Sequence, residues 1–203
     1  MSASLLWSIF GPPLKRRTYI ADPPSEYVVI DLETTGLDPE TCEIIQIAAV
    51  RYRNFEEVAS YHTKVKPTAP IPMAATQING ITDNMVRLAP SIGKVKQPLS
   101  DFVGNTMVVG YNFWRFDRNF LIAAYGHEYV QAWPVIDVLA CALETLEKQQ
   151  SYKLADLASA IGYHGTAHDA LSDCRATSKV FEYLCRPSQG LKKYFLFRRR
   201  NRR

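Results

Sequence analysis

The stretch Val28-Val29-Ile30-Asp31-Leu32-Glu33-Thr34-Thr35-Gly36 combines a strand pattern with two acidic side chains. The apolar, β-branched run over Tyr27–Leu32 is typical of a buried strand, and a glycine follows it as a turn signal. Side chains two positions apart on a strand point the same way. We therefore expect Asp31 and Glu33 to leave one face of a sheet and Leu32 to leave the other.

Further strands are indicated on both sides of a helical region. Ile44–Tyr52 repeats the apolar pattern, and Val58–Val65 alternates with period two, so the first three strands predict a meander. Met107–Val109 predicts another short, buried strand. Strands that come first and then interleave with helices predict an α/β architecture, with one mixed central sheet flanked by helices.

Helical patterns begin after Pro72. Asp83 and Ser91 are placed to cap two segments, and Asp137 is placed to cap a third. The remaining helices are predicted over Phe113–Tyr125, Leu139–Leu146, Leu154–Ile161 and Leu171–Cys185.

Length and composition favour one domain with appendages. The chain has 203 residues, 47% of them apolar and 22% charged, which excludes disorder as the main state. No run approaches the roughly 18 apolar residues of a membrane span. Residues 1–25 contain four prolines without periodicity and predict an irregular leader. The domain is then expected over residues 26–185, and a basic tail over residues 186–203.

The location expected for this chain is the cytoplasm. The apolar residues between Leu5 and Phe10 have no basic residue before them and are followed by Lys15, Arg16 and Arg17, an order that is wrong for a secretory signal. The four cysteines, at positions 42, 141, 174 and 185, show no paired or metal-binding spacing. They are therefore expected to be separate thiols in a reducing compartment.

Charge is distributed unevenly along the chain. The net charge is +4, but eight basic residues and no acidic residue lie in residues 186–203, so residues 1–185 carry 16 basic and 20 acidic side chains. The tail has two interpretations, a contact for a polyanionic partner or a solvated, disordered end.

Three acidic strings are candidates for chemistry. Asp31 and Glu33 are either a solvated strand end or a site for hard divalent cations, which prefer carboxylate oxygens. Asp117 is either an ordinary charge at a helix N-terminus or part of the same site. In His168-Asp169-Ala170-Leu171-Ser172-Asp173, five helical residues turn about 140° beyond a full turn, which places Asp173 on the helix and His168 in the loop before it. The equal spacing of His164 and Asp169 shows that spacing alone selects neither histidine.

Together, three strings resemble the DnaQ-like (DEDDh) family of 3′-to-5′ exonucleases. They are Asp-x-Glu-Thr-Thr-Gly from Asp31, Asn-x-x-x-Phe-Asp from Asn112, and His-x-Ala-x-x-Asp from His168. Gln77–Thr82, Ser151–Leu154 and Asp173–Thr177 are similar to the exonuclease units of bacterial DNA polymerase III. The resemblance covers residues 26–185 and implies a ribonuclease H-like fold.

The resemblance also implies roles for individual residues. Asp31, Glu33, Asp117 and Asp173 would hold two divalent cations, Mg²⁺ or Mn²⁺, and His168 would be the general base. The contacts to the terminal 3′ nucleotide are implied at Thr34, Thr35, Asn79, Ile81, Asn112 and Phe116. The chain departs from the family at Asn79 and Tyr111, where the family often has histidine.

The expected function is metal-dependent removal of nucleoside 5′-monophosphates from single-stranded or frayed DNA 3′ ends. One alternative is trimming of RNA 3′ ends, because the same carboxylates cut either polymer. A non-catalytic adaptor that binds nucleic acid or a polymerase is the alternative from another class. The partners expected are a nucleic-acid 3′ end and a DNA polymerase or replication complex, without a membrane.

Overall fold

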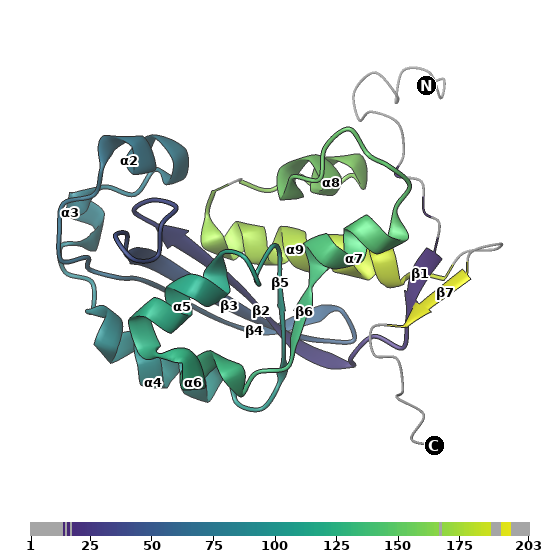
Figure 1. Cartoon of the computed structure of the whole chain (residues 1–203), viewed down its shortest axis with the longest axis horizontal. Helices are drawn as coiled ribbons and strands as arrows, with labels where there is room; N and C mark the ends of the chain where they lie inside the picture. The colour runs from purple at the N-terminus through teal and green to yellow at the C-terminus, as the bar shows by residue number, and fades with distance from the viewer. Residues whose placement is uncertain (1–13, 15, 17, 167, 188–191, 196–203) are drawn as a thin grey trace.

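The structure is a computed structural model that describes residues 14, 16, 18–166, 168–187 and 192–195. Its main sheet has five strands in the order β4-β3-β2-β5-β6. The strands β2, β3 and β4 form an antiparallel meander, whereas β5 and β6 are parallel to β2. The mixed sheet predicted from the sequence is confirmed (Figure 1). The bounds are β2 Glu26–Thr34, β3 Ile44–Arg53, β4 Glu56–Lys64, β5 Met107–Gly110 and β6 Val135–Asp137.

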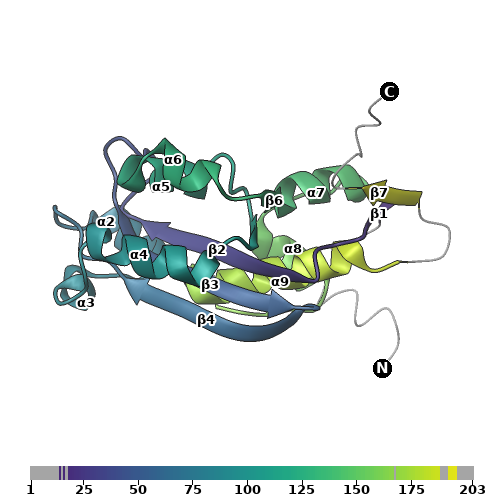
Figure 2. The same cartoon turned by 90° about the horizontal axis from the view of Figure 1, so that it is seen from below.

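Helices pack on both faces of this sheet. Tyr27 and Val29 belong to a buried cluster with residues of α7, α8 and α9, whereas Val28, Ile30 and Leu32 belong to a second cluster with residues of α4 and α5. The alternation along β2 therefore places Asp31 and Glu33 on the side of α9, as expected. Figure 2 shows the layers from below. The helices are α2 Met73–Asn79, α3 Asp83–Val86, α4 Ile92–Val103, α5 Asp117–Tyr125, α6 His127–Gln131, α7 Val138–Thr145, α8 Leu154–Ala160 and α9 Ala170–Cys185.

Some helix boundaries differ from the sequence prediction. Asp83 is the first residue of α3 rather than its cap, and its carboxylate accepts a hydrogen bond from the backbone N–H of Ile71 at 2.9 Å. Ser91 is at the N-cap position of α4 as predicted, although its hydroxyl makes no capping bond. The helix predicted from Phe113 begins only at Asp117. Residues 113–116 form a turn before the helix instead of its first turn.

A second, two-stranded sheet joins parts of the segments that were expected to be a leader and a tail. Within residues 1–25, Thr18–Ala21 form β1, which pairs in parallel with β7 (Lys192–Phe195) from the segment expected to be a basic tail. Ile20 of β1 is buried in the same cluster as α7 and α9. Figure 1 shows this sheet at the opposite end of the molecule from α2 and α3. The rest of the predicted leader and tail lies largely outside the described residues.

Two predictions about the whole chain can be compared with the fold. All four cysteines are free thiols, as their spacing predicted, and Cys141, Cys174 and Cys185 are also buried. Among the helices in the described part of the chain, none combines the length and hydrophobicity of a membrane span.

Candidate active site

A cavity of about 660 Å³ lies at the carboxyl end of β2. Its walls come from β2 and the loop after it, α2, the loop between β5 and α5, the start of α8, and the segment that leads into α9. All five residues for which the sequence implied a catalytic role line it: Asp31, Glu33, Asp117, His168 and Asp173. Segments that are far apart in the sequence therefore meet in one place.

Three of the carboxylates form a compact group. One oxygen from each of Asp31, Glu33 and Asp173 lies within 4.8 Å of the other two. Asp173 is in the first turn of α9, and two neighbours on that helix fix its position. The buried Cys174 thiol lies 3.6 Å from the carbonyl oxygen of Val29, and the Arg175 guanidinium makes two hydrogen bonds of 2.8 and 2.9 Å to Glu57 of β4.

Asp117 joins the same cavity from the other side of β2. It is the first residue of α5 and is only 3% exposed, and its Oδ1 accepts a hydrogen bond from the backbone N–H of Leu32 at 3.1 Å. This bond places Asp117 directly beside the segment that carries Asp31 and Glu33. An oxygen of Asp117 is not among the three that lie within 4.8 Å of one another.

The Asp137 carboxylate organises the loop before α5. It caps α7 as predicted, because it accepts hydrogen bonds from the backbone N–H groups of Leu139 and Ala140. It also accepts bonds from the N–H groups of Asn112 at 3.2 Å and Trp114 at 3.1 Å. Because these donors are held outside a helix, α5 starts late and Asp117 faces the cavity.

His168 lies in the loop before α9, as the sequence predicted, and its side chain is exposed at the cavity. Its backbone has a φ of 60°, a conformation that few non-glycine residues adopt. The backbone N–H of His168 donates a hydrogen bond to Asp173 Oδ2 at 3.1 Å. The loop is thereby tied to the carboxylate while the imidazole remains available to a substrate.

The pKa values of all four carboxyl groups are raised in the absence of a cation. Burial, together with the nearby charges of Asp117 and Asp173, raises the pKa of Asp31 well above its usual range. Burial and the Asp173 charge raise the pKa of Glu33 to about 7, against a hydrogen bond from Asn79 that lowers it. Burial also raises the pKa of Asp117 to about 8 and raises the pKa of Asp173. Ionisation of the cluster is therefore opposed by burial and by repulsion between the carboxylates.

This arrangement fits hard divalent cations. Carboxylate oxygens are the ligands that Mg²⁺ and Mn²⁺ prefer, and a cation relieves the repulsion between buried carboxylates. Three aspartates and one glutamate, from β2, α5 and α9, provide the donors, so the residues present fit the divalent cations that the sequence implied.

We expect the stability of the cation-free protein to fall as the pH rises. Glu33 and Asp117 have folded pKa values of about 7 and about 8, above their unfolded values near 4. A raised folded pKa stabilises the protein below the unfolded pKa, and this contribution is lost as the pH rises through the folded pKa. Between pH 4 and pH 8.5, the loss is on the order of 3 kcal/mol for Glu33, at about 1.4 kcal/mol per pKa unit.

Thermal unfolding with a chelator, at several pH values, measures this effect. Mn²⁺ is expected to restore the melting temperature at pH 8, and Asp31→Asn is expected to reduce both the pH dependence and the gain from Mn²⁺. Equal pH profiles for the wild type and the variant, without an effect of Mn²⁺, would contradict the repulsion described above.

Most of the implied substrate contacts lie around the carboxylates. Thr34, Thr35, Asn79, Asn112 and Phe116 all line the cavity. The Thr34 hydroxyl donates to the Gly36 carbonyl at 2.6 Å, and the Thr35 hydroxyl oxygen accepts from the Glu43 N–H at 2.9 Å, so both hydroxyls also shape the loop after β2.

Asn79, where the family often has histidine, connects α2 to β2. Its side-chain amide donates to the Thr34 carbonyl at 3.3 Å, and its Oδ1 accepts from the Ile81 N–H at 3.0 Å. Ile81 itself does not line the cavity. It is 2% exposed and packs with Ile45 and Val86 in a small separate core, so the structure places its side chain outside the cavity.

Several cavity residues carried no assignment from the sequence. They belong to an apolar wall and to the start of α8, and only their place in the fold brings them to the site. Tyr111 and the segment Tyr152–Leu154 had appeared in the motifs without a role. The other lining residues without an assigned role are Leu32, Gly36, Leu37, Ala74, Ala75, Ile78 and Leu139.

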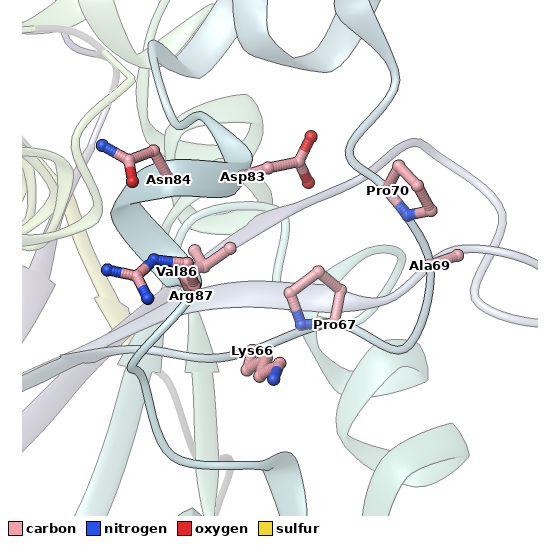
Figure 3. A pocket seen from close by; sticks show the side chains of 8 residues that line it. All are labelled: Lys66, Pro67, Ala69, Pro70, Asp83, Asn84, Val86 and Arg87. Atoms are coloured by element: carbon pink, nitrogen blue, oxygen red, sulfur yellow. The ribbon is translucent and has the colours of Figure 1, made fainter.

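A second hollow lies near α3 and has a different character. Figure 3 shows it between the segment that carries Lys66, Pro67 and Pro70 and helix α3, which begins at Asp83 and is followed by Arg87. It shares no lining residue with the carboxylate cavity. None of the three grouped carboxylates lines this hollow, whereas all three line the first cavity.

The chain matches the model of a known protein family. The family model described as Exonuclease, of the RNase T type, matches residues 28–181. The chain belongs to this exonuclease family. The match spans β2 to α9 and confirms the resemblance to DnaQ-like exonucleases.

Two relatives of the chain are much longer proteins. The DNA polymerase III PolC-type of Thermotoga petrophila is 37% identical over 159 residues, which are 76% of this chain and 11% of that protein. The 3′-5′ exonuclease DinG of Staphylococcus aureus is 33% identical over 157 residues, 76% of this chain and 17% of that protein. The chain thus spans less than a fifth of these curated relatives.

A solved structure shows the same fold. Exonuclease I of E. coli, in a complex with single-stranded DNA, matches with a TM-score of 0.67 and 23% identity. The match covers 79% of this chain and 42% of that chain. The ribonuclease H-like fold expected from the sequence is therefore confirmed.

Proposed function

We propose that this chain is a metal-dependent 3′-to-5′ exonuclease that releases nucleoside 5′-monophosphates from single-stranded or frayed DNA 3′ ends. The observation that carries the proposal is the group formed by Asp31, Glu33 and Asp173 in one cavity with Asp117 and His168. The relatives named as a polymerase III and as a 3′-5′ exonuclease support DNA as the substrate. A non-catalytic adaptor has no need of all five positions.

Asp31, Glu33, Asp117 and Asp173 would hold two divalent cations, Mg²⁺ or Mn²⁺. When bound, such cations supply Lewis-acid stabilisation of the negative charge that develops on phosphate oxygens. Asn79 keeps the end of β2 in place beside these ligands, and Phe116 offers an aromatic ring next to them. The 3′ end would therefore lie between α2 and the loop before α5.

His168 would act as the general base. Its imidazole accepts a proton from the water molecule that attacks phosphorus, a step that contributes typically 10²–10⁴-fold to a rate. The new P–O bond forms in line with the bond from phosphorus to the 3′ oxygen, which breaks. The products are a nucleoside 5′-monophosphate and a strand shortened by one nucleotide with a free 3′ hydroxyl.

Matched DNA and RNA oligonucleotides of one sequence, labelled at the 5′ end, test the proposal. We expect stepwise shortening of single-stranded DNA with Mg²⁺ or Mn²⁺, release of mononucleotides, and no reaction with a chelator. Faster shortening of RNA would replace the DNA assignment by RNA 3′-end trimming. The absence of mononucleotide release with either polymer, at either cation, would remove the enzymatic assignment.

The proposed partner besides nucleic acid is a DNA polymerase or replication complex, and the proposed location is the cytoplasm. The similarity to a PolC-type polymerase supports this partner. Copurification of the full chain with a replicative polymerase from the same organism is the measurement that checks it.

A further inference from the structure

One cation lies in the wall of the carboxylate cavity. Lys153 is the only lysine or arginine among the lining residues, and its side chain is exposed. Within the part of the chain that the structure describes, its ammonium group has no carboxylate within salt-bridge distance. The ammonium group of Lys153 is therefore available to bind an anionic group of a ligand.

The backbone at Lys153 is held on both sides. Lys153 occupies the N-cap position of α8, and its carbonyl accepts hydrogen bonds from the N–H groups of Asp156 and Leu157, each at 3.1 Å. Its own N–H donates to the Ser151 hydroxyl at 3.2 Å. On the preceding residue, the Tyr152 carbonyl accepts a bond from the hydroxyl of Tyr111. The backbone that carries the Lys153 side chain is therefore held in place by hydrogen bonds.

Tyr111 suits this anchoring role. It follows β5 directly and lines the cavity, and burial raises the pKa of its hydroxyl, which stays protonated and can donate. Tyr111 stands where the family often has histidine. The departure noted in the sequence thus ties the end of β5 to the segment that carries Lys153.

Charge decides what the ammonium group can bind. A single strand carries one negative charge on each phosphate, and the carboxylate cavity repels it. Divalent cations at the carboxylates would compensate the phosphate whose bond is cleaved. The next phosphate on the 5′ side has no such compensation, and Lys153 is the one cation that the described cavity wall offers to it.

We propose that Lys153 binds the internucleotide phosphate on the 5′ side of the cleaved one, and so makes the site selective for oligonucleotides over single nucleotide esters. The inference rests on the proposed exonuclease function. It assigns to Lys153 a substrate-binding role, without a part in bond cleavage.

Binding of a fluorescent single-stranded oligothymidylate of eight nucleotides tests this role without catalysis. With Ca²⁺ as the cation, we expect Lys153→Ala to weaken binding about tenfold and to reduce the dependence of log K on log salt by about 0.7 for the lost contact. Lys153→Arg should retain most of the affinity. The matched control is Lys148→Ala, which removes an exposed lysine outside the cavity and should change nothing.

Hydrolysis separates the two phosphates. For Lys153→Ala, we expect a higher KM with little change in kcat on the oligonucleotide, and an unchanged rate on the p-nitrophenyl ester of thymidine 5′-monophosphate, which has only the cleaved phosphate. Equal losses on both substrates, or binding equal to that of the wild type, would overturn the inference. If the wild type binds the oligonucleotide but hydrolyses neither substrate, the proposed exonuclease function is wrong. The binding comparison between the wild type and Lys153→Ala then tests the phosphate contact by itself.

Discussion

Asp31→Asn and Asp173→Asn variants are expected to lose metal-dependent digestion of labelled single-stranded DNA by at least about 10³-fold. Each change keeps the shape of the side chain but removes a charged ligand from the group within 4.8 Å. Stabilisation by a cation is worth several kcal/mol, and each 1.4 kcal/mol corresponds to a factor of ten in rate. The measurement is the initial rate of mononucleotide release with saturating Mn²⁺.

The fold is expected to survive both changes. Because asparagine carries no charge, it relieves the repulsion that raises the pKa of the remaining carboxylates, and the variants should unfold at a temperature no lower than the wild type in the absence of cations. Asp101→Asn provides a matched control, since Asp101 is an exposed residue of α4 outside the cavity. Full activity of either site variant would contradict the proposed cation site.

His168→Ala is expected to lower the turnover by about 10²–10⁴-fold, the usual contribution of a general base. The side chain lines the cavity, whereas its backbone holds Asp173, so the substitution removes the ring and keeps the backbone hydrogen bond. The rate constant at saturating oligonucleotide and cation is the quantity to compare. Added imidazole should restore part of the rate, because it replaces the missing base.

His164→Ala separates this role from a general effect of losing a histidine. His164 has the same spacing to Asp169 that His168 has to Asp173, but it does not line the carboxylate cavity. We expect the His164 variant to stay close to the wild-type rate. A loss of equal size in both variants, or none in His168→Ala, would contradict the assignment of the base.

The sequence predicted the part of the fold that local patterns encode. Alternation along residues 27–32 assigned Asp31 and Leu32 to opposite faces of the sheet, and the helical segment after His168 placed Asp173 correctly. The pairing of β1 with β7 escaped prediction, because it joins segments at the two ends of the chain that carry no local sign of each other. The three-residue strand β6 was too short for any period to appear.

The candidate site shows the same division. Its acidic residues and histidine could be named because the three strings that carry them resemble those of a known family. Ile81 stands in such a motif as well, but the structure buries it in a separate core. Lys153 and Leu139 reach the cavity only through the packing of α8 and α7, and no spacing along the chain reports that packing.

The Asp137 carboxylate has a consequence for how activity responds to distant change. It holds the amides of Asn112 and Trp114 and, at the same time, those of Leu139 and Ala140 at the start of α7. The loop before α5 and the N-terminus of α7 are thus held by hydrogen bonds to the same side chain. A substitution in α7, or in a residue that packs against α7, should therefore displace the loop before α5. The rate of hydrolysis should fall before the melting temperature does.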